Sequence, residues 1–295
     1  MLRNTKIKSF SNTYLTRRIQ IKKHFKNFYD NVFISFLPFF QVDRQSTSET
    51  NFKKSKQITY EQALNEMEFL KDIPKPDAEI YSYSNKDYPT EEEIFKKGKI
   101  ITWETILKGA GFTDFSELNK ALRTSIGALR PVFQKLELRD KLNNYTDKQG
   151  IWHPTEGSFD TISKVAIYKT LKILGKSKLV LSDEFYEETS ILELDNLTEF
   201  EFTEKVSFKN YYLYSIDKEI LFTIEWDSFF FLIATDSKKM TQIIEENLFE
   251  GFLCDEKTHH KWDYIEGEIE ELLDLEEKQK TRNVTTNKQW WKFWN

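Results

Sequence analysis

The strongest constraint on the fold of this chain is a run of strand-like segments between residues 199 and 235. Apolar side chains recur at every second position, or in short continuous runs, in the segments EFEFTEKVSF, YYLYSID, EILFTIEWD and FFFLIATD. Short runs rich in aromatic and β-branched residues are typical of strands. The connection IDKE at 216–219 is short enough for a hairpin. The sequence therefore predicts an antiparallel meander across residues 199–235.

Helix signals dominate the first half of the chain. Thr59 with Gln62, and the segment TEEE at 90–93, have the spacing of capping boxes that open helices. Residues 102–130 predict two short helices joined by GAGF, and further helices are predicted from Ser158 to Gly175 and from Ser237 onward. The apolar segments at 32–40 and KLVLS at 178–182 predict buried strands.

These elements predict an α+β fold, with a helical N-terminal half and a mixed, mainly antiparallel sheet with helices in the C-terminal half. We divide the chain into a basic arm and linker at 1–56, one α+β domain at 57–265, and an acidic segment with an aromatic tail at 266–295. Residues 1–26 carry eight Lys or Arg side chains and no acid, although the whole chain has a net charge of −5. Because such extensions are usually solvated, we expect deletion of residues 1–30 to leave stability nearly unchanged.

The cysteine content and the hydropathy suggest where the protein works. A single cysteine excludes an intramolecular disulfide and favours a reducing compartment, so the cytoplasm is the expected location. No segment approaches the roughly 18 uninterrupted apolar residues that a membrane-spanning helix needs. The apolar run at 32–40 and the tail WWKFWN leave a peripheral membrane contact as a lesser alternative.

The helical pair at 102–130 has two interpretations. It could be a DNA-reading helix-turn-helix, whose second helix would offer Asn119, Lys120 and Arg123 to a base edge. An ordinary helical hairpin is the commoner use of this pattern. The acidic charge outside the arm also argues against nucleic acid as a partner.

The segment GFLCDEKTHHKWD at 251–263 concentrates reactive side chains, among them Cys254, Asp255, His259 and His260. These residues lack the close ligand pairs of zinc sites, so we predict a buried Cys254, histidines in a loop or on the surface, no metal ligands and no cofactor. A cysteine nucleophile with His259 or His153 as its base is the alternative.

Carboxylates at strand ends are the other candidates for chemistry. Asp183 and Glu184 follow one predicted strand and Asp227 follows another, so they could meet at one sheet edge and bind a metal or a basic group. Turns also favour such residues, and that explanation is the simpler one. The low-ranked catalytic candidates are Asp183, Glu184, Asp227, Cys254 and His259. Phosphate-binding and dinucleotide-binding glycine motifs are absent from the sequence.

The segments KLVLSDEF, WDSFFFLI and FEGFLCDEKTHHKW together resemble an uncharacterised bacterial family of Bacillus-like organisms, domain-of-unknown-function family 2711. The resemblance covers roughly residues 100–265 and implies no catalytic residues. The pairing of WDSFF with EGFLC is also similar, more weakly, to bacterial toxin-immunity proteins, which act by binding a toxin.

Three functions follow from these patterns. The first is a cytoplasmic binding protein, of the toxin-immunity type, whose acidic face takes a basic protein partner. The second is a metal-dependent or cysteine hydrolase. The third is a nucleic-acid-binding protein that uses the basic arm.

Overall fold

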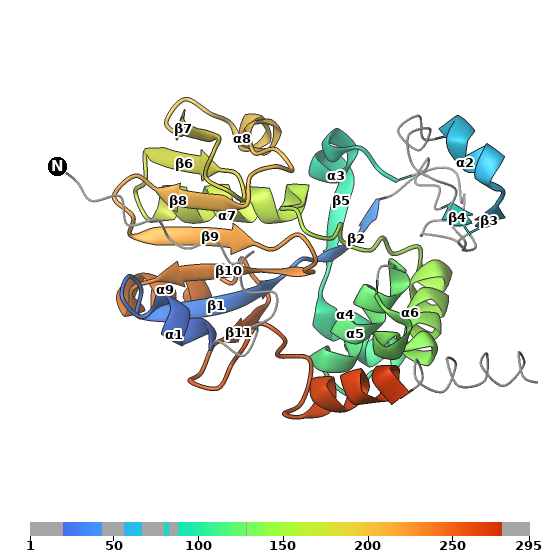
Figure 1. The fold of residues 1–295 in the computed structure, drawn as a ribbon. Helices are drawn as coiled ribbons and strands as arrows, with labels where there is room; N and C mark the ends of the chain where they lie inside the picture. Colours follow the sequence, from blue (N-terminus) through green and yellow to red (C-terminus); the bar gives the residue numbers. More distant parts are fainter. Residues whose placement is uncertain (1–19, 43–55, 67–79, 83–87, 128, 279–295) are drawn as a thin grey trace, which may run out of the picture.

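A computed structural model describes residues 20–42, 56–66, 80–82, 88–127 and 129–278 (Figure 1). Its centre is a seven-stranded sheet in which every neighbouring pair is antiparallel. The strands lie in the order β11 (Gly251–Leu253), β1 (Asn31–Phe36), β10 (Phe230–Thr235), β9 (Ile220–Ile224), β8 (Tyr212–Ser215), β6 (Lys178–Ser182) and β7 (Thr189–Glu193).

Alternation along the strands of the main sheet places its buried apolar side chains in two clusters, one on each face. In β9, Phe222 faces one cluster and its neighbour Leu221 faces the other. The Phe222 face is covered by α7 (Thr161–Ile173), α8 (Glu199–Lys205) and α9 (Ser237–Glu245). The Leu221 face is covered in part by α1 (Ile21–Phe25).

A helical unit lies beside the sheet and is joined to it by β1. The chain leaves β1, passes Pro38 and forms β2 (Phe39–Val42), which pairs with β5 (Gly98–Ile101) outside the main sheet. The unit also contains α3 (Glu91–Lys97), α4 (Trp103–Ala110), α5 (Phe115–Ser125), the 3-10 turn Pro131–Phe133 and α6 (Leu136–Gln149). A separate small group comprises β3 (Lys56–Ile58), α2 (Tyr60–Glu66) and β4 (Ile80–Ser82).

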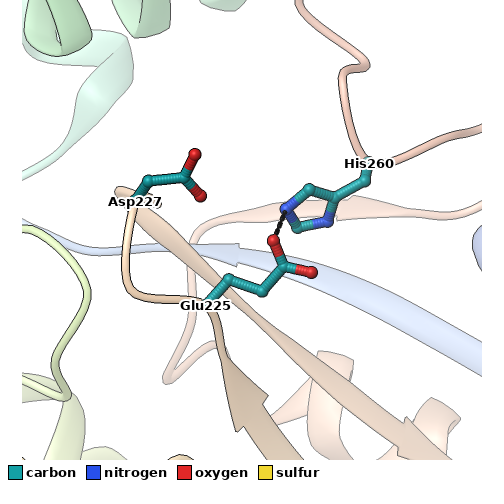
Figure 2. A group of neighbouring side chains, drawn as sticks. All are labelled: Glu225, Asp227 and His260. Carbon is teal, nitrogen blue, oxygen red and sulfur yellow. Dashed lines mark ion pairs between the residues drawn. The ribbon is translucent and has the colours of Figure 1, made fainter. Parts of the chain in front are cut away.

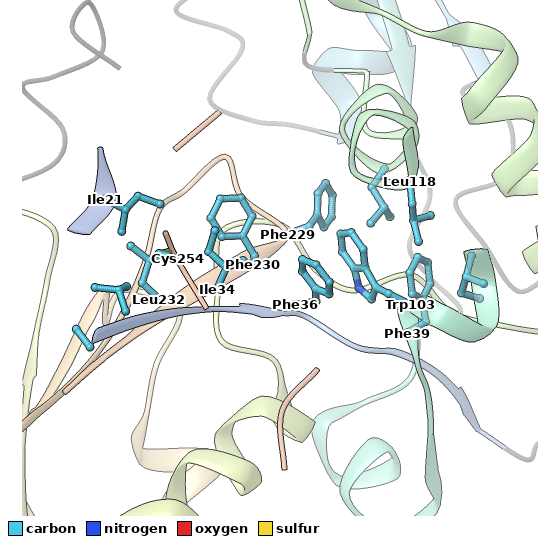
Figure 3. Packing of buried hydrophobic residues seen from close by; sticks show 14 of the residues in the cluster. Ile21, Ile34, Phe36, Phe39, Trp103, Leu118, Phe229, Phe230, Leu232 and Cys254 are labelled. Carbon is cyan, nitrogen blue, oxygen red and sulfur yellow. The ribbon is translucent and has the colours of Figure 1, made fainter. Parts of the chain in front are cut away.

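Trp103 packs the helical unit against the sheet (Figure 3). Its ring is fully buried and stacks on Phe36 of β1 with ring centroids 4.2 Å apart, and its Nε1–H donates to the carbonyl of Leu37 at 2.7 Å. The carboxylate of Glu250, just before β11, accepts from the backbone N–H groups of Trp103 and Glu104 at 2.6 and 2.8 Å. Glu250 thereby caps α4 from the sheet side.

Most sequence predictions of local structure are confirmed. The fold is α+β, residues 32–40 supply buried strand, and β8, β9 and β10 form the predicted meander. The capping boxes at Thr59 and Thr90 are present, as are both helices of the 102–130 pair. The predicted linker at 43–56 lies almost entirely outside the described residues.

The strand predicted at 199–208 is wrong. Residues Glu199–Lys205 form α8, because Thr198 and Glu201 complete a capping box that satisfies the first backbone N–H groups of a helix. Phe202 is buried in this helix, as it would be in a strand, so the alternation in EFEF does not distinguish the two structures. The helical prediction for 102–130 holds, but Asn119 and Arg123 point into the protein toward Asp263 and do not form a DNA-reading face.

The N-terminal arm and the acidic C-terminal segment that the sequence analysis set apart both pack against the rest of the protein within the described residues. Ile21, Phe25 and Tyr29 are buried in the cluster on the Leu221 face, so residues 20–30 are not a solvated arm. Residues 268–278 are helical, and Lys120 pairs with Glu268 at 2.9 Å. Within the described residues, no helix combines the length and the apolar character that crossing a membrane requires.

Phe25 and Phe28 give a matched test of how the first described residues contribute. Phe25→Ala should lower the free energy of unfolding by about 3–5 kcal/mol, because it empties a buried site. Phe28→Ala, at a side chain that is 59% exposed, should change it by less than about 0.5 kcal/mol. Urea unfolding of both variants measures the difference, and equal small effects would show that α1 is not part of the core.

Candidate functional site

Two carboxylates and a histidine meet at the end of β9, where the sheet faces the helical unit (Figure 2). Glu225 and Asp227 follow β9, and His260 comes from the loop after β11. One ligand atom from each side chain lies within 4.8 Å of the other two. The Nε2 of His260 is 2.7 Å from Oε2 of Glu225, and the His260 side chain is only 10% exposed.

Local structure explains why both carboxylates point the same way. Glu225 continues the alternation of β9 and so takes the face of Leu221. A turn then follows, in which the N–H of Ser228 donates to the carbonyl of Glu225 at 3.1 Å. The turn leaves Trp226 51% exposed between the two acids.

His260 is held by the loop that contains it. Asp255 Oδ1 accepts from the backbone N–H groups of Lys257 and Thr258 at 2.9 and 2.7 Å, which closes a tight turn before the histidines. The His260 ring then packs on Phe230, with ring centroids 5.3 Å apart. Its neighbour His259 forms a bridge with Gln20 instead. His260 therefore lies in a loop, as predicted, but only 10% of its side chain is exposed.

More charged side chains surround this trio. Asp263 is 1% exposed, and its Oδ2 accepts from Asn119 Nδ2 at 3.0 Å and from Arg123 Nη1 at 3.4 Å. Lys261 Nζ lies 3.8 Å from Oδ2 of Asp227. Glu156 completes the group, since it interacts electrostatically with Asp227, Arg123 and Lys261. Four carboxylates thus face two cationic side chains, which leaves an excess of negative charge when all six are ionised.

The loop that carries Glu156 lies directly on the turn after β9. The N–H of Gly157 donates to the carbonyl of Ser228 at 2.9 Å, and Gly157 has a φ of +65°. A Cβ atom at position 157 would lie 2.0 Å from the carbonyl oxygen of Trp226, so only glycine permits this approach. Burial raises the pKa of Glu156 to about 7, and the charge of Asp227 adds to the rise while Arg123 and Lys261 oppose it.

The strand ends that precede the carboxylates proposed from the sequence lie at one edge of the sheet, because Ser182 of β6 pairs with Tyr212 of β8 and Tyr212 pairs with Thr223 of β9. Asp227 belongs to the trio, whereas Asp183 closes the turn after β6, where its Oδ1 accepts from the N–H groups of Glu187 and Glu188 at 2.8 and 3.2 Å. Glu184 interacts electrostatically with both Glu225 and Asp183. Burial, and then the charges of Glu225 and Asp183, raise the pKa of Glu184.

Cys254 lies in the core, as predicted, with 7% of its surface exposed. Its N–H donates to the carbonyl of Val32 at 2.9 Å, and burial raises the pKa of its thiol to about 12. His153, the other proposed base, is buried in the helical unit beside Thr146, and burial lowers its pKa to about 3.

Sequence reasoning missed Glu225, Glu156 and the role of His260. One signal was available, since Glu225 and Asp227 stand two residues apart at the end of a strand-like segment. No pattern linked them to residues 156 and 260, because that proximity depends on the tertiary fold.

The fold and this site together define an α+β protein with a cluster of carboxylates and a histidine where its sheet meets its helical unit. The chain belongs to the family described as "Protein of unknown function (DUF2711)", whose model matches residues 17–264. This confirms the resemblance seen in the sequence. It is also similar to "Uncharacterized protein YwbB" of Bacillus subtilis (strain 168), with 29% identity over 180 residues that cover 59% of this chain and 77% of that protein. No solved structure matches the chain. The weaker resemblance to toxin-immunity proteins stays a prediction.

The raised pKa of Glu156 predicts a dependence of stability on pH. Folding raises this pKa from 4.5 to about 7, so the folded state binds a proton more tightly, and the ionised carboxylate weakens the fold as pH rises from about 4.5 through 7. Glu156→Gln removes this loss. In the presence of a chelator, the melting temperature of Glu156→Gln should therefore rise relative to that of the wild type as the pH is raised from 5 to 8.

The exposed Glu187 provides the control for this measurement, since Glu187→Gln removes a surface carboxylate and should not reproduce the gain. A difference between Glu156→Gln and wild type that does not change with pH would contradict the assignment of the raised pKa to Glu156.

The environment of Cys254 predicts a slow thiol. A buried thiol with a pKa of about 12 is almost entirely protonated at neutral pH, and the thiolate is the reactive form. A thiol reagent should therefore label the native protein far more slowly than the protein in denaturant. Equal labelling rates in the two states would show that Cys254 is accessible and would support the hypothesis that it is a catalytic nucleophile.

Proposed function

We propose that this protein binds a divalent metal ion through Glu225, Asp227 and His260 and uses it in a hydrolytic reaction. The observation that carries the proposal is the convergence of three ligand atoms within 4.8 Å of one another, from two separate loops. Carboxylate oxygens and an imidazole nitrogen are ordinary ligands of catalytic metal ions.

Charge supports a cation in particular. The surrounding carboxylates outnumber the cationic side chains, and a dication would compensate the excess. The network also contains a buried acceptor, Oδ1 of Asn119, that receives no hydrogen bond from the described residues. A site built only for stability would normally satisfy such an atom.

The arrangement suits the activation of water. Three protein ligands leave coordination positions for water and a substrate, as in catalytic zinc sites. A bound divalent ion lowers the pKa of its water and so supplies a hydroxide nucleophile near neutral pH. Lys261, close to Asp227, brings a positive charge that could stabilise a developing oxyanion.

The other functions have less support. A cysteine hydrolase needs a thiolate, which the raised pKa of Cys254 disfavours. A nucleic-acid-binding function has less support because the side chains of Asn119 and Arg123 contact Asp263 and are not available to bases. An acidic face that takes a basic partner, the toxin-immunity relationship and a cytoplasmic location stay predictions.

Calorimetric titration tests the proposal. Protein freed of metal by a chelator should bind one Mn²⁺ or one Zn²⁺ ion per chain. Asp227→Asn and His260→Ala should each weaken binding by at least about tenfold, since each removes a direct ligand. Glu187→Gln should bind as the wild type does, and circular dichroism checks that each variant is folded. Absence of stoichiometric binding by the wild type would refute the metal site.

A panel of chromogenic phosphate and carboxylic esters tests the hydrolytic part. Turnover by the wild type should require added metal and should be lost in Asp227→Asn. Turnover that persists in this variant would place the reaction elsewhere.

A further inference from the structure

We infer that β7, the strand at one edge of the main sheet, binds a basic, extended segment of a partner protein, which adds to the sheet as a further strand. The inference goes beyond the proposed function and does not depend on it, because β7 supplies none of the grouped ligands Glu225, Asp227 and His260. It names a docking surface and the chemistry of the segment that occupies it.

The first support is the position of β7 at the edge of the sheet. Within the described residues, β7 pairs with β6 alone, and no strand lies on its other side (Figure 1). The N–H of Leu194 donates to the carbonyl of Ser177 at 2.7 Å, and the N–H of Asp183 donates to the carbonyl of Glu188 at 3.2 Å. Residues of an antiparallel strand alternately bond to the neighbouring strand and point away from it. These two bonds therefore fix which residues of β7 bond to β6.

The alternation directs the N–H and C=O groups of Thr189, Ile191 and Glu193 to the open edge. Within the described part of the chain, no hydrogen bond reaches these groups. Proteins commonly protect such an edge with a lysine or a proline, and the sequence TSILE of β7 contains neither. The side chain of Ile191, at the centre of the strand, is 57% exposed. β7 thus presents a row of backbone donors and acceptors, with an apolar contact, to an added strand.

The second support is the charge around this edge. Residues 183–195 contain six carboxylates and no Lys or Arg. Nearby lysines pair with two of these carboxylates, Glu193 and Asp195. Glu187 and Glu188, directly before β7, are exposed and form no ion pair with any described residue. A segment that carries Lys or Arg side chains past these acids would be attracted to the edge and selected by its charge.

The same charges argue against a second copy of this chain as the occupant. In an antiparallel pair of two copies centred on Ile191, Glu187 of one copy would lie opposite Asp195 of the other. In a parallel pair in register, each acid would lie beside the same acid of the other copy. Like charges directly opposite each other destabilise a pair of strands. The edge therefore favours a cationic strand from a different protein.

Fluorescence anisotropy with synthetic peptides tests the inference. The probe is a short labelled peptide of alternating lysine and valine. One control is the matching glutamate and valine peptide, and the other is the lysine and valine peptide with every backbone amide N-methylated. The wild type should bind the probe at least about tenfold more tightly than either control, because the first control reverses the charge and the second lacks the backbone donors of a strand. Binding should weaken as salt is added.

Two changes at Ile191 separate backbone pairing from side-chain contact. Ile191→Pro removes the outward N–H at the centre of the edge, and the N–H groups that bond to β6 stay in place, since proline is tolerated in edge strands. This variant should bind the lysine and valine peptide at least about tenfold more weakly than the wild type, because one backbone bond is lost and the strand is interrupted. Ile191→Ala keeps the N–H and should weaken binding less. Circular dichroism checks that both variants are folded.

A matched pair of double variants tests the charge and does not alter the backbone. Glu187→Lys with Glu188→Lys should weaken binding of the lysine and valine peptide by at least about tenfold, because it places like charges beside the added strand. The control is Glu245→Lys with Glu246→Lys, which makes the same change in net charge at exposed positions at the end of α9, a helix that packs on β1 and β10. The control should bind as the wild type does.

Each contrary result has a distinct meaning. If the wild type does not bind the lysine and valine peptide, the docking surface is refuted. Equal binding of the N-methylated peptide would show attraction of charge without strand addition and would overturn the inference. Sedimentation velocity tests the remaining occupant, since self-association that Ile191→Pro abolishes would assign the edge to a second copy. Peptide binding should be the same with and without a chelator, so this test is independent of the metal site.

Discussion

The structure depends on the way Trp103 joins the helical unit to the sheet. Its ring stacks on Phe36 at the end of β1, and its indole N–H is satisfied by the Leu37 carbonyl immediately beyond that strand. Glu250, directly before the strand on the other side of β1, caps the helix that Trp103 begins. Burial of a large aromatic ring and two charge-assisted hydrogen bonds therefore act at one point. With α4 fixed there, α5 is placed so that Asn119 and Arg123 reach Asp263.

Local signals in the sequence predicted local structure well. The capping boxes at Thr59 and Thr90 and the meander from β8 to β10 depend on residues close together in the chain, and each forms as expected. The segment at 199–208 shows the limit of this reasoning, because alternation and a capping box gave opposite answers there. The segment follows the capping signal and forms α8. Phe202 of this helix packs on a face of the sheet that the segment was expected to join as a strand.

Only part of the site could be predicted from the sequence, and the cause differs from that at residues 199–208. Asp227 was a candidate from its place after a strand, and Cys254 was correctly expected in the core. Glu156, Glu225 and His260 come together only because β1 inserts between β10 and β11 and the loop of Gly157 lies on the turn after β9. Pairing of strands far apart in sequence leaves no periodic trace in a single chain, so this proximity had no local signal.

Burying charge where the sheet meets the helical unit is costly, and the fold offsets the cost in three places. Arg123 lies against Asp263, Lys261 lies near Asp227, and His260 contacts Glu225. The attraction in each contact offsets part of the desolvation penalty, which is several kcal/mol per buried ion. Arg123 and Lys261 also act to lower the pKa of Glu156, but burial and the charge of Asp227 outweigh them, so this pKa stays raised.

If stability alone mattered at position 156, an apolar side chain of similar size would serve better, because it has no charge to desolvate. A binding site for a cation has the opposite requirement, since its last carboxylate must stay unneutralised until the ion supplies the charge. Burial makes the ionised form of Glu156 costly and so raises its pKa, and a positive charge nearby would lower that cost.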